Sequence, residues 1–257
     1  MASQETATTR KHVCLYLVGD SDIERWPSNM LPTPKDCVLV QPTVVVGQSG
    51  ATLSDIVPHG AHLVVQEQQQ QQQPQVTTTT TTTATTISPT IYHILIVCAG
   101  ENDIGNGSSL RESVRACQQV LDTVLDTTNH NTNSRTQQHW HVVLLGPKLE
   151  PWLQHDPPSR KHYIQLSRAL ERTCHQFAAT HNGSGGSGCH FVECLLLFCG
   201  DTAHGKGALL GGQAIPQGLY FDTDQLHLSL QGYQLWNTIV EESISKIVNE
   251  NEKQKPK

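Results

Sequence analysis

Short apolar runs and segments of helical periodicity alternate along the chain. Five runs rich in Val, Ile and Leu are bounded by turn residues; they are 13–18, 38–46 (interrupted by Pro42), 91–98, 141–145 and 191–198. Continuous apolar runs of this length are typical of strands that are buried on both faces of a sheet. We therefore expect these five runs to form a parallel sheet.

Apolar residues at steps of three and four lie between the runs and predict helices. The clearest patterns cover 110–124, 163–177 and 230–247, and another helical segment begins at Thr52. Ser229 is placed to cap the last helix. Strands that alternate with helices of this length form crossover units, which cover a parallel sheet on both sides. The sequence predicts a three-layer α/β fold with a doubly wound parallel sheet of about five strands.

Polar segments interrupt this pattern and indicate one domain with appendages. Residues 67–89 hold a glutamine tract and then a threonine tract, which cannot bury enough apolar surface to offset the entropy of ordering. We expect a flexible N-terminus over 1–10, a single domain over 11–249 with a disordered insertion at 67–89, and a polar tail over 250–257. We also hypothesise that the glycine-rich segment 199–221 shapes a substrate pocket.

Composition excludes some classes of partner. The chain has 257 residues, of which 37% are hydrophobic, and a formal net charge of -6 without a cluster of Lys or Arg. Phosphate binding needs concentrated positive charge, so we expect no nucleic-acid partner. The sequence shows neither a signal-peptide pattern nor the ~18 successive apolar residues of a membrane span, which predicts a cytoplasmic protein. The oligomeric state stays open.

Cysteine and histidine are frequent, but their spacing favours neither disulfides nor a metal site. The eight cysteines form no C-x-x-C pair, and several fall inside apolar runs, which favours buried free thiols. His139 and His141 are the closest histidine pair, and no cysteine or suitable carboxylate accompanies them. We expect no metal and no cofactor.

Four short motifs lie where chemistry is expected, because reactive groups of parallel α/β sheets gather at the carboxyl ends of the strands. They follow predicted strands or precede the final helix, and are Gly19-Asp20-Ser21, Gly47-Gln48-Ser49-Gly50, Gly100-Glu101-Asn102-Asp103 and Asp224-Gln225-Leu226-His227. Taken alone, Ser21 to Glu24 also fits S-x-x-E, in which the serine only caps a helix. Together and in this order, the motifs resemble those of the SGNH hydrolases, also called the GDSL esterase/lipase family.

The resemblance covers the chain from about Val13 to the final helix, apart from the polar insertions. It implies the flavodoxin-like SGNH hydrolase fold and a serine esterase that hydrolyses small acyl esters. Ser21 is then the nucleophile, His227 the base and Asp224 the carboxylate that orients the imidazole. A serine hydroxyl needs such a base, and an imidazole that titrates near neutrality suits this role. Asp222 is a weaker alternative to Asp224.

The tetrahedral intermediate of ester hydrolysis needs hydrogen-bond donors for its oxyanion. By resemblance, these donors are the backbone N–H groups of Ser21 and Gly50 and the side-chain amide of Asn102. Gly47 is an alternative to Gly50, although residues 49–52 match the family's S-G-x-T pattern better.

Neighbouring residues are expected to support the site. The resemblance implies that Asp20 and Asp103 orient their loops through hydrogen bonds. For Trp26 and Trp152, both core packing and substrate contact are open interpretations.

Other activities share this machinery. Carbohydrate deacetylases, thioesterases and lysophospholipases use the same triad, and the sequence does not separate them. A binding protein on the same fold without activity is an alternative of another class. Because all the chemical roles have a candidate residue, we expect an enzyme whose partner is a small-molecule ester.

Overall fold

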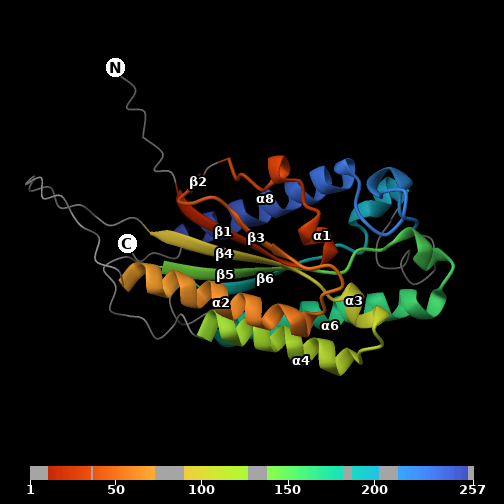
Figure 1. The fold of residues 1–257 in the computed structure, drawn as a ribbon, viewed down its shortest axis with the longest axis horizontal. Helices are drawn as coiled ribbons and strands as arrows, with labels where there is room; N and C mark the ends of the chain where they lie inside the picture. Colours follow the sequence, from red (N-terminus) through yellow and green to blue (C-terminus); the bar gives the residue numbers. More distant parts are fainter. Residues whose placement is uncertain are drawn as a thin grey trace, which may run out of the picture.

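A sheet of parallel strands lies between two layers of helices (Figure 1). The computed structural model describes residues 11–35, 37–72, 90–126, 138–181, 187–202 and 214–253. The strands are β1 (Lys11–Gly19), β2 (Cys37–Leu39), β3 (Val44–Gly47), β4 (Ile91–Cys98), β5 (Gln138–Leu145) and β6 (Gly188–Val192). The α-helices are α1 (Ser21–Glu24), α2 (Leu53–Gln72), α3 (Glu101–Gly105), α4 (Leu110–Leu121), α6 (Pro157–His181) and α8 (Leu230–Lys253). The short turns of 3-10 or π type are η1 (Ser28–Met30), η2 (Asp122–Asp126), η3 (Pro151–Gln154), η4 (Leu197–Thr202) and η5 (Gly218–Tyr220).

The sheet is doubly wound about β1. Its order is β2-β1-β4-β5-β6, β3 also pairs with β1, and every pair of strands is parallel. The chain therefore leaves β1 for one side of the sheet and returns to its other side at β4. In such sheets, ligands bind outside the carboxyl ends of the strands where the direction reverses. The predicted three-layer, doubly wound α/β fold is confirmed.

The second predicted strand is divided into two. The run 38–46 forms β2 and β3, which pair with β1 over Lys11 to Val13 and over Tyr16 to Gly19, respectively. Pro42 lies between them, and its nitrogen has no hydrogen to donate to a sheet. The sheet consequently has six strands instead of about five.

The last strand of the sheet is shifted towards the N-terminus relative to the apolar run that predicted it. The run covers 191–198, whereas β6 ends at Val192. The Glu193 carboxylate then accepts a hydrogen bond from the Leu195 N–H at 2.9 Å and holds the chain in a turn. Leu195 and Phe198 are still buried, because the turn packs into the core. Hydrophobicity alone does not separate a buried strand from a buried turn.

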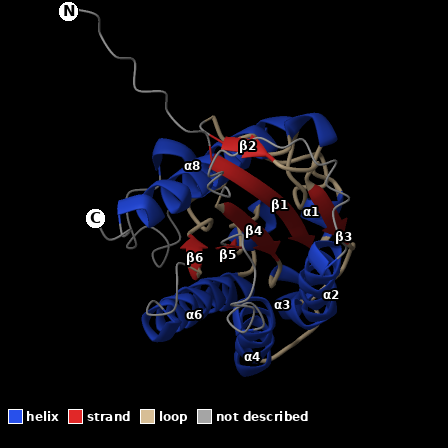
Figure 2. Cartoon of the chain, turned by 90° about the vertical axis from the view of Figure 1, so that its left-hand side faces the viewer, coloured by secondary structure: helices blue, strands red, loops and turns tan. Residues whose placement is uncertain are grey.

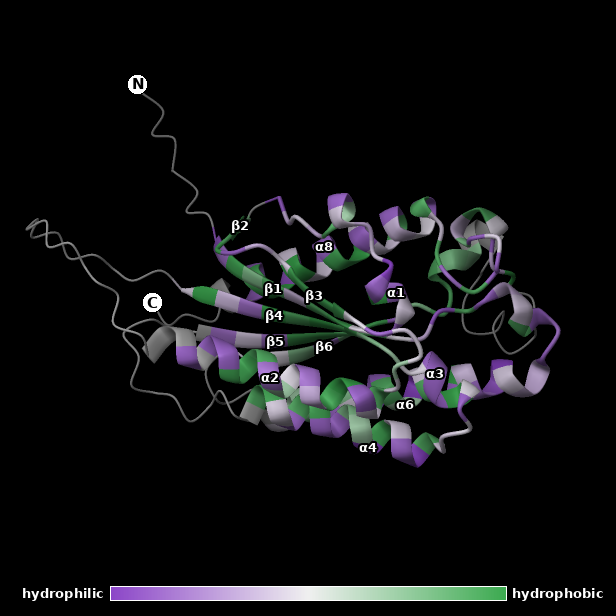
Figure 3. Ribbon diagram, in the orientation of Figure 1, coloured by the Kyte–Doolittle hydropathy of each residue, from purple (hydrophilic) through white to green (hydrophobic). Residues whose placement is uncertain are grey.

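Successive side chains of β1 point to opposite faces of the sheet, and each face has its own core. Leu15 and Leu17 pack with α1 and α8, whereas Tyr16 and Val18 pack with α2, α4 and α6. Figure 2 shows these two groups of helices on opposite sides of the sheet. Figure 3 shows the hydrophobic strands between them. Because both faces of the sheet are buried, the strands are continuous apolar runs in the sequence.

The helices cover the predicted segments. The apolar face of α6 from Tyr163 to Phe177 is buried, as is the face of α8 from Tyr233 to Ile247. Leu230, also expected in that face, is 61% exposed. Ser229 caps α8, as predicted, by accepting a hydrogen bond from the Gly232 N–H at 3.2 Å.

Two helices extend past their expected ends, one into the insertion that was expected to be disordered and one into the polar tail. Helix α2 continues to Gln72, so residues 67–72 are helical, and α8 continues to Lys253, so the first part of the tail 250–257 is helical too. Once a helix has formed, adding Gln, Glu or Lys to its end costs little, which explains both extensions. The predictions for 1–10, 73–89 and the central part of 199–221, residues 203–213, concern residues outside the described ranges.

One pair of cysteines forms a disulfide, which corrects the prediction of free thiols throughout. Cys174 of α6 is bonded to Cys189 of β6. The six other cysteines have thiols, and all but Cys37 are buried. A separation of 15 residues, across a helix-to-strand connection, gave no local signal of this pairing.

In the described ranges, no helix is both long and apolar enough to cross a membrane. The same ranges contain no group of three or more His, Cys, Asp or Glu side chains arranged for a metal ion. That the chain is cytoplasmic and uses no metal, cofactor or nucleic acid stays a prediction from its sequence.

Candidate active site

Three neighbouring strands end at the same level of the sheet. Gly19, the last residue of β1, is in register with Gly47 of β3 and with Cys98 of β4. Backbone hydrogen bonds continue past the strands, from the Gln48 N–H to the Gly19 carbonyl (3.0 Å) and from the Asp20 N–H to the Cys98 carbonyl (3.1 Å). The motifs that follow these strands are therefore side by side.

Close backbone packing at this edge explains two of the motif glycines. A Cβ atom on Gly19 would lie 2.2 Å from the Cys98 carbonyl oxygen, and one on Gly47 would lie 2.1 Å from the Glu24 nitrogen of α1. Neither position accommodates a side chain without moving backbone. Gly47 thus lets α1 lie against β3, and this role favours Gly50 over Gly47 as the exposed loop glycine.

The Ser21 side chain is not the cap of its helix, which corrects the local interpretation of S-x-x-E. Asp20 is the N-cap of α1 and accepts a hydrogen bond from the Asp22 N–H at 3.1 Å. The Glu24 carboxylate accepts a hydrogen bond from the Ser49 hydroxyl. Because Asp20 supplies the cap, the Ser21 hydroxyl is left for another partner.

That partner is His227, which lies 206 positions away in the sequence. The His227 Nε2 is 3.0 Å from the Ser21 Oγ, and its Nδ1 is 2.6 Å from the Asp224 Oδ2. The other Asp224 oxygen accepts hydrogen bonds from the N–H groups of Leu226 and His227, each at 3.0 Å. Ser21, His227 and Asp224 therefore form one continuous hydrogen-bonded series.

The alternative carboxylate, Asp222, has a different function in this turn. Its N–H donates to the His227 carbonyl at 2.8 Å, and its carboxylate accepts from the Thr223 N–H at 2.7 Å. An antiparallel bridge between Phe221 and Leu228 closes the same turn. The geometry favours Asp224 over Asp222 as the partner of the imidazole.

Hydrogen bonding keeps Asp224 ionised. Partial burial raises the pKa of Asp224, but the hydrogen bond from the His227 ring and those from the His227 and Leu226 amides lower it by more, so the net pKa lies below its usual value. Arg25 adds a weak contact, 3.6 Å from the Asp224 Oδ2, between half-exposed side chains. An anionic carboxylate is thus held against the imidazole Nδ1.

Gly50 and Asn102 belong to two loops that hydrogen bond to each other. Gly50 has a φ of +77°, a left-handed conformation that favours glycine, and no atom lies within 4 Å of where a Cβ would be. The Asn102 Nδ2 donates to the Ala51 carbonyl at 3.1 Å, which leaves its second N–H for another acceptor. Among the described residues, the backbone N–H groups of Ser21 and Gly50 have no protein acceptor.

The two aspartates that were expected to support the loops make such bonds. Asp20 caps α1, and the Asp103 Oδ2 accepts a hydrogen bond from the Leu53 N–H at 2.9 Å, which fixes the start of α2 to α3. Burial raises the pKa of Asp103 above its usual value. Both carboxylates are buried under the site.

Sequence reasoning missed a buried lysine beneath the site. The Lys148 Nζ lies 2.6 Å from an oxygen of Asp22, 2.6 Å from one of Glu101 and 3.0 Å from one of Glu150. Asp22 follows Ser21 directly, and Glu101 precedes Asn102. The available signal in the sequence was that charged residues stand directly beside Ser21 and Asn102. Charged side chains are usually solvated, so the sequence gave no indication that these residues are buried.

The two tryptophans near the site differ. Trp26 is buried and stacks on Trp236 with ring centroids 5.3 Å apart, so the packing interpretation holds for it. Trp152 is 36% exposed, and its indole N–H donates to the Glu150 Oε2 at 2.6 Å. Its role as a pocket wall stays open.

A polar cavity of about 470 Å³ adjoins the turn that contains Asp224 and His227. It lies between η3 and residues 218–225, and its lining includes Gln154, His155, Asp222 and Gln225. Gln225 has a φ of +55°, a conformation uncommon for a residue with a side chain. This cavity is a candidate substrate pocket by its position.

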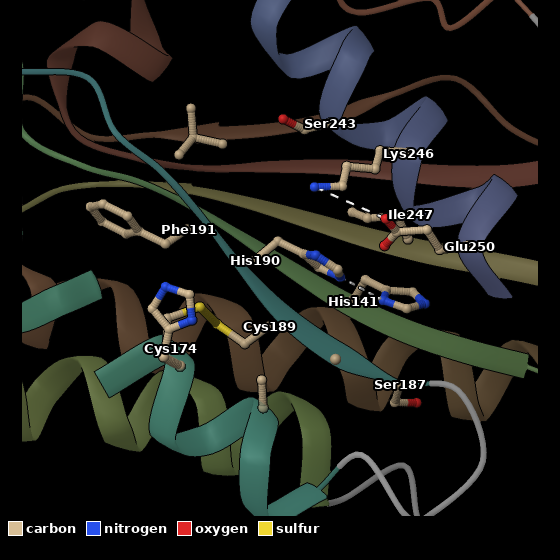
Figure 4. A pocket seen from close by; sticks show the side chains of 14 residues that line it. His141, Cys174, Ser187, Cys189, His190, Phe191, Ser243, Lys246, Ile247 and Glu250 are labelled. Carbon is tan, nitrogen blue, oxygen red and sulfur yellow. Dashed lines mark hydrogen bonds and ion pairs between the residues drawn. A yellow bond between two sulfur atoms is a disulfide. The ribbon is translucent and has the colours of Figure 1, made fainter. Parts of the chain in front are cut away.

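A second cavity of about 400 Å³ lies along β6 between α6 and α8 (Figure 4). There His141 and His190 lie 3.3 Å apart, between Nδ1 and Nε2, and the Cys174–Cys189 disulfide forms part of the wall. None of the predicted site residues lines this cavity.

We predict that Asp20→Asn stabilises the protein increasingly as the pH rises. Burial, together with the charge of Asp22, raises the pKa of Asp20 to about 7, although Lys148 opposes the shift. In the unfolded chain this pKa is about 4, so the folded state favours the protonated carboxyl and loses stability as the pH rises from about 4 to about 7. Asparagine keeps an oxygen for the Asp22 N–H and has no charge. Urea unfolding of the wild type and of Asp20→Asn at pH 4.5 and at pH 7.5 measures the difference in their free energies of unfolding. If the extra stability of the variant does not grow with pH, the pKa of Asp20 is not raised in the folded state.

Solved structures match this fold over most of the chain. A protein of the lipolytic G-D-S-L family from Veillonella parvula DSM 2008 has a TM-score of 0.51 and 13% identity, covering 90% of this chain and 97% of that one. A protein from Bacteroides fragilis NCTC 9343, provisionally named an acylhydrolase, has a TM-score of 0.51 and 15% identity, with coverage of 93% and 91%. One from Streptococcus pneumonia, provisionally named a platelet activating factor, has a TM-score of 0.50 and 16% identity, with coverage of 93% and 86%. No protein-family model and no curated protein matches the sequence.

At identities of 13 to 16%, this likeness concerns the fold. It agrees with the independent observation that the four motifs lie at the carboxyl edge of a doubly wound sheet. The chain therefore has the fold of the G-D-S-L, or SGNH, hydrolases, as the order of its motifs predicted.

Proposed function

We propose that this protein is an SGNH-type serine hydrolase that cleaves ester bonds through an acyl-enzyme intermediate. The observation that carries the proposal is the hydrogen-bonded series from Ser21 through His227 to Asp224. A cap or a turn histidine has no need of this contact, whereas nucleophilic catalysis requires it. The strand-end motifs and the fold support the same activity.

The triad performs the reaction in two halves. His227 Nε2 removes the proton from the Ser21 hydroxyl as its oxygen attacks the ester carbonyl, and Asp224 stabilises the imidazolium that forms. The imidazolium then gives this proton to the departing alcohol, and the acyl group stays on Ser21. In the second half, His227 takes a proton from water, the resulting hydroxide attacks the acyl-enzyme, and the acid is released as Ser21 regains its proton.

Three donors stabilise the oxyanion of each tetrahedral intermediate in this proposal. They are the backbone N–H groups of Ser21 and Gly50 and the remaining side-chain N–H of Asn102. Support comes from the absence of a protein acceptor for the two backbone groups in the described ranges, and from the hydrogen bond that fixes Asn102 to Ala51. Donors held in place before the reaction cost no reorganisation when the charge develops.

The proposed substrate is an acetyl or other short acyl ester of a polar alcohol or sugar. The polar cavity beside the Asp224–His227 turn favours this class, because Gln154, His155 and Gln225 offer hydrogen bonds to hydroxyl groups. A carbohydrate deacetylase is therefore the preferred form of the activity over a thioesterase or a lysophospholipase. An inactive binding protein stays the alternative of another class.

Labelling by a fluorophosphonate probe tests the nucleophile. The wild-type chain should react at Ser21, and Ser21→Ala should not react. Asp224→Asn should lower kcat for p-nitrophenyl acetate by about 10³-fold or more, because the amide no longer stabilises the imidazolium. Asp222→Asn is the comparison for the alternative carboxylate and should stay within about threefold of wild type, because p-nitrophenyl acetate has no hydroxyl group to bind in the polar cavity that Asp222 lines. A wild-type chain that resists the probe, or equal losses in both aspartate variants, contradicts the proposed triad.

Asn102→Ala tests the side-chain donor. It removes one hydrogen bond to the oxyanion and should lower kcat by about 10²-fold with a small change in KM. Asn106→Ala, at the exposed end of α3, is the control and should have no effect on steady-state kinetics. If Asn102→Ala changes KM and leaves kcat at the wild-type value, Asn102 is not an oxyanion donor.

A substrate panel tests the polar cavity. Gln154→Ala should raise KM for an acetylated monosaccharide by about fivefold, since one hydrogen bond to a hydroxyl is worth about 1 kcal/mol. The same variant should hydrolyse p-nitrophenyl acetate within about twofold of the wild-type rate. Gln176→Ala, exposed on α6, is the control. Equal effects of Gln154→Ala on both esters would remove the cavity from substrate recognition.

A further inference from the structure

Lys148 lies at the centre of a buried cluster that joins the two halves of the candidate site. It follows β5, and its ammonium contacts Asp22 of α1 and Glu101 of α3 at 2.6 Å each, and Glu150 of its own loop at 3.0 Å. Asp22 is the residue after the proposed nucleophile, and Glu101 is the residue before Asn102. One cation therefore links the short helices on which both reactive side chains lie.

The cluster is withdrawn from solvent. The Lys148 side chain is 1% exposed, that of Glu150 is fully buried, and those of Asp22 and Glu101 are 3% and 14% exposed. Burial lowers the pKa of Lys148, but the charges of Asp22, Glu101 and Glu150 raise it by more, so the lysine stays protonated. Taking these charges out of water is costly, so a buried ion cluster is weak evidence of a purely stabilising role.

Two of the three carboxylates, Glu101 and Glu150, are also held by further hydrogen bonds. The Glu101 Oε1 accepts a hydrogen bond from the Lys148 N–H at 2.8 Å. The Glu150 Oε2 accepts from the Trp152 indole at 2.6 Å and from the Tyr163 hydroxyl at 3.0 Å. These bonds leave the carboxylates little freedom to rotate. The ammonium thus links α1 to α3 through Asp22 on one side and the doubly held Glu101 on the other.

We propose that Lys148 is the positioning residue of this site, holding α1 and α3 so that the Ser21 hydroxyl and the Asn102 amide address the same ester carbonyl. The inference rests on the proposed function. Lys148 contacts neither the Ser21 side chain nor the Asn102 side chain, and acts on them through Asp22 and Glu101. Helix α1 has four residues and α3 has five, so neither is stable as an isolated helix and each depends on tertiary contacts for its position.

This role predicts a loss of kcat at nearly unchanged KM. An oxyanion donor and a nucleophile displaced by about 1 Å lose alignment in the transition state, which costs about 10²-fold, whereas the ground-state ester still binds. A residue that only stabilised the fold would reduce the amount of folded protein and leave the kcat of each folded molecule intact. The two roles therefore differ in kcat per active site.

Lys148→Met tests the inference, because methionine has a similar length and no charge. Active sites are titrated with the fluorophosphonate probe, and kcat and KM are measured with p-nitrophenyl acetate. The expected result is a fall in kcat per active site of about 10²-fold with KM within about twofold of wild type. Leu170→Ala, a buried substitution on α6 whose side chain belongs to the core on the α2–α4–α6 face of the sheet, is the stability control and should keep wild-type kcat.

Glu101→Gln is the second variant, for the case that Lys148→Met does not fold. It keeps Lys148 paired with Asp22 and Glu150 but weakens the charged link to α3, and it should lower kcat by about tenfold. If folded Lys148→Met has the wild-type kcat per active site, the positioning role is overturned. If Lys148→Met does not fold, a wild-type kcat per active site in Glu101→Gln overturns it. A wild-type chain that neither reacts with the probe nor hydrolyses the ester overturns the proposed function, and this inference with it.

Discussion

The site depends on the register of three parallel strands. Gly19, Gly47 and Cys98 end β1, β3 and β4 at one level, so the loops that follow them begin side by side. A shift of one residue in any of these pairs would turn the side chains of that strand to the opposite face. The register itself is specified by burial, because both faces of the sheet are packed against helices. Core packing thus determines the geometry of the candidate site.

The fourth motif reaches the site by a longer route. The turn that contains Asp224 and His227 is closed by the bridge between Phe221 and Leu228, and α8 begins directly after it. Trp236 of α8 is buried against the sheet, so packing of the helix fixes the position of the turn in front of it. The contact between Ser21 and His227 therefore forms only when the C-terminal helix is docked on the sheet.

Electrostatics at the site separates the roles of its carboxylates. Asp224 is partly exposed and receives several hydrogen bonds, so it stays ionised beside His227. Asp20 and Glu101 are buried, and burial raises the pKa of each. Lys148 compensates this group of acids with one cation. Anionic charge is thus kept at the imidazole and reduced beneath Ser21, where the proposed mechanism places an oxyanion.

The sequence by itself determined the fold class, the main helices and the residues that lie at the strand ends, because burial and capping leave local patterns. It did not determine where an apolar run leaves the sheet, as at Glu193, or that Pro42 divides a strand. The Cys174–Cys189 bond and the contacts of Lys148 with Asp22 and Glu101 also required the tertiary structure, since their partners belong to different elements of the fold. Asp20, not Ser21, caps α1, and that choice depended on how the loop meets β4. Periodicity reports which residues are buried, whereas the partners of a buried charge or thiol are fixed only when the elements pack together.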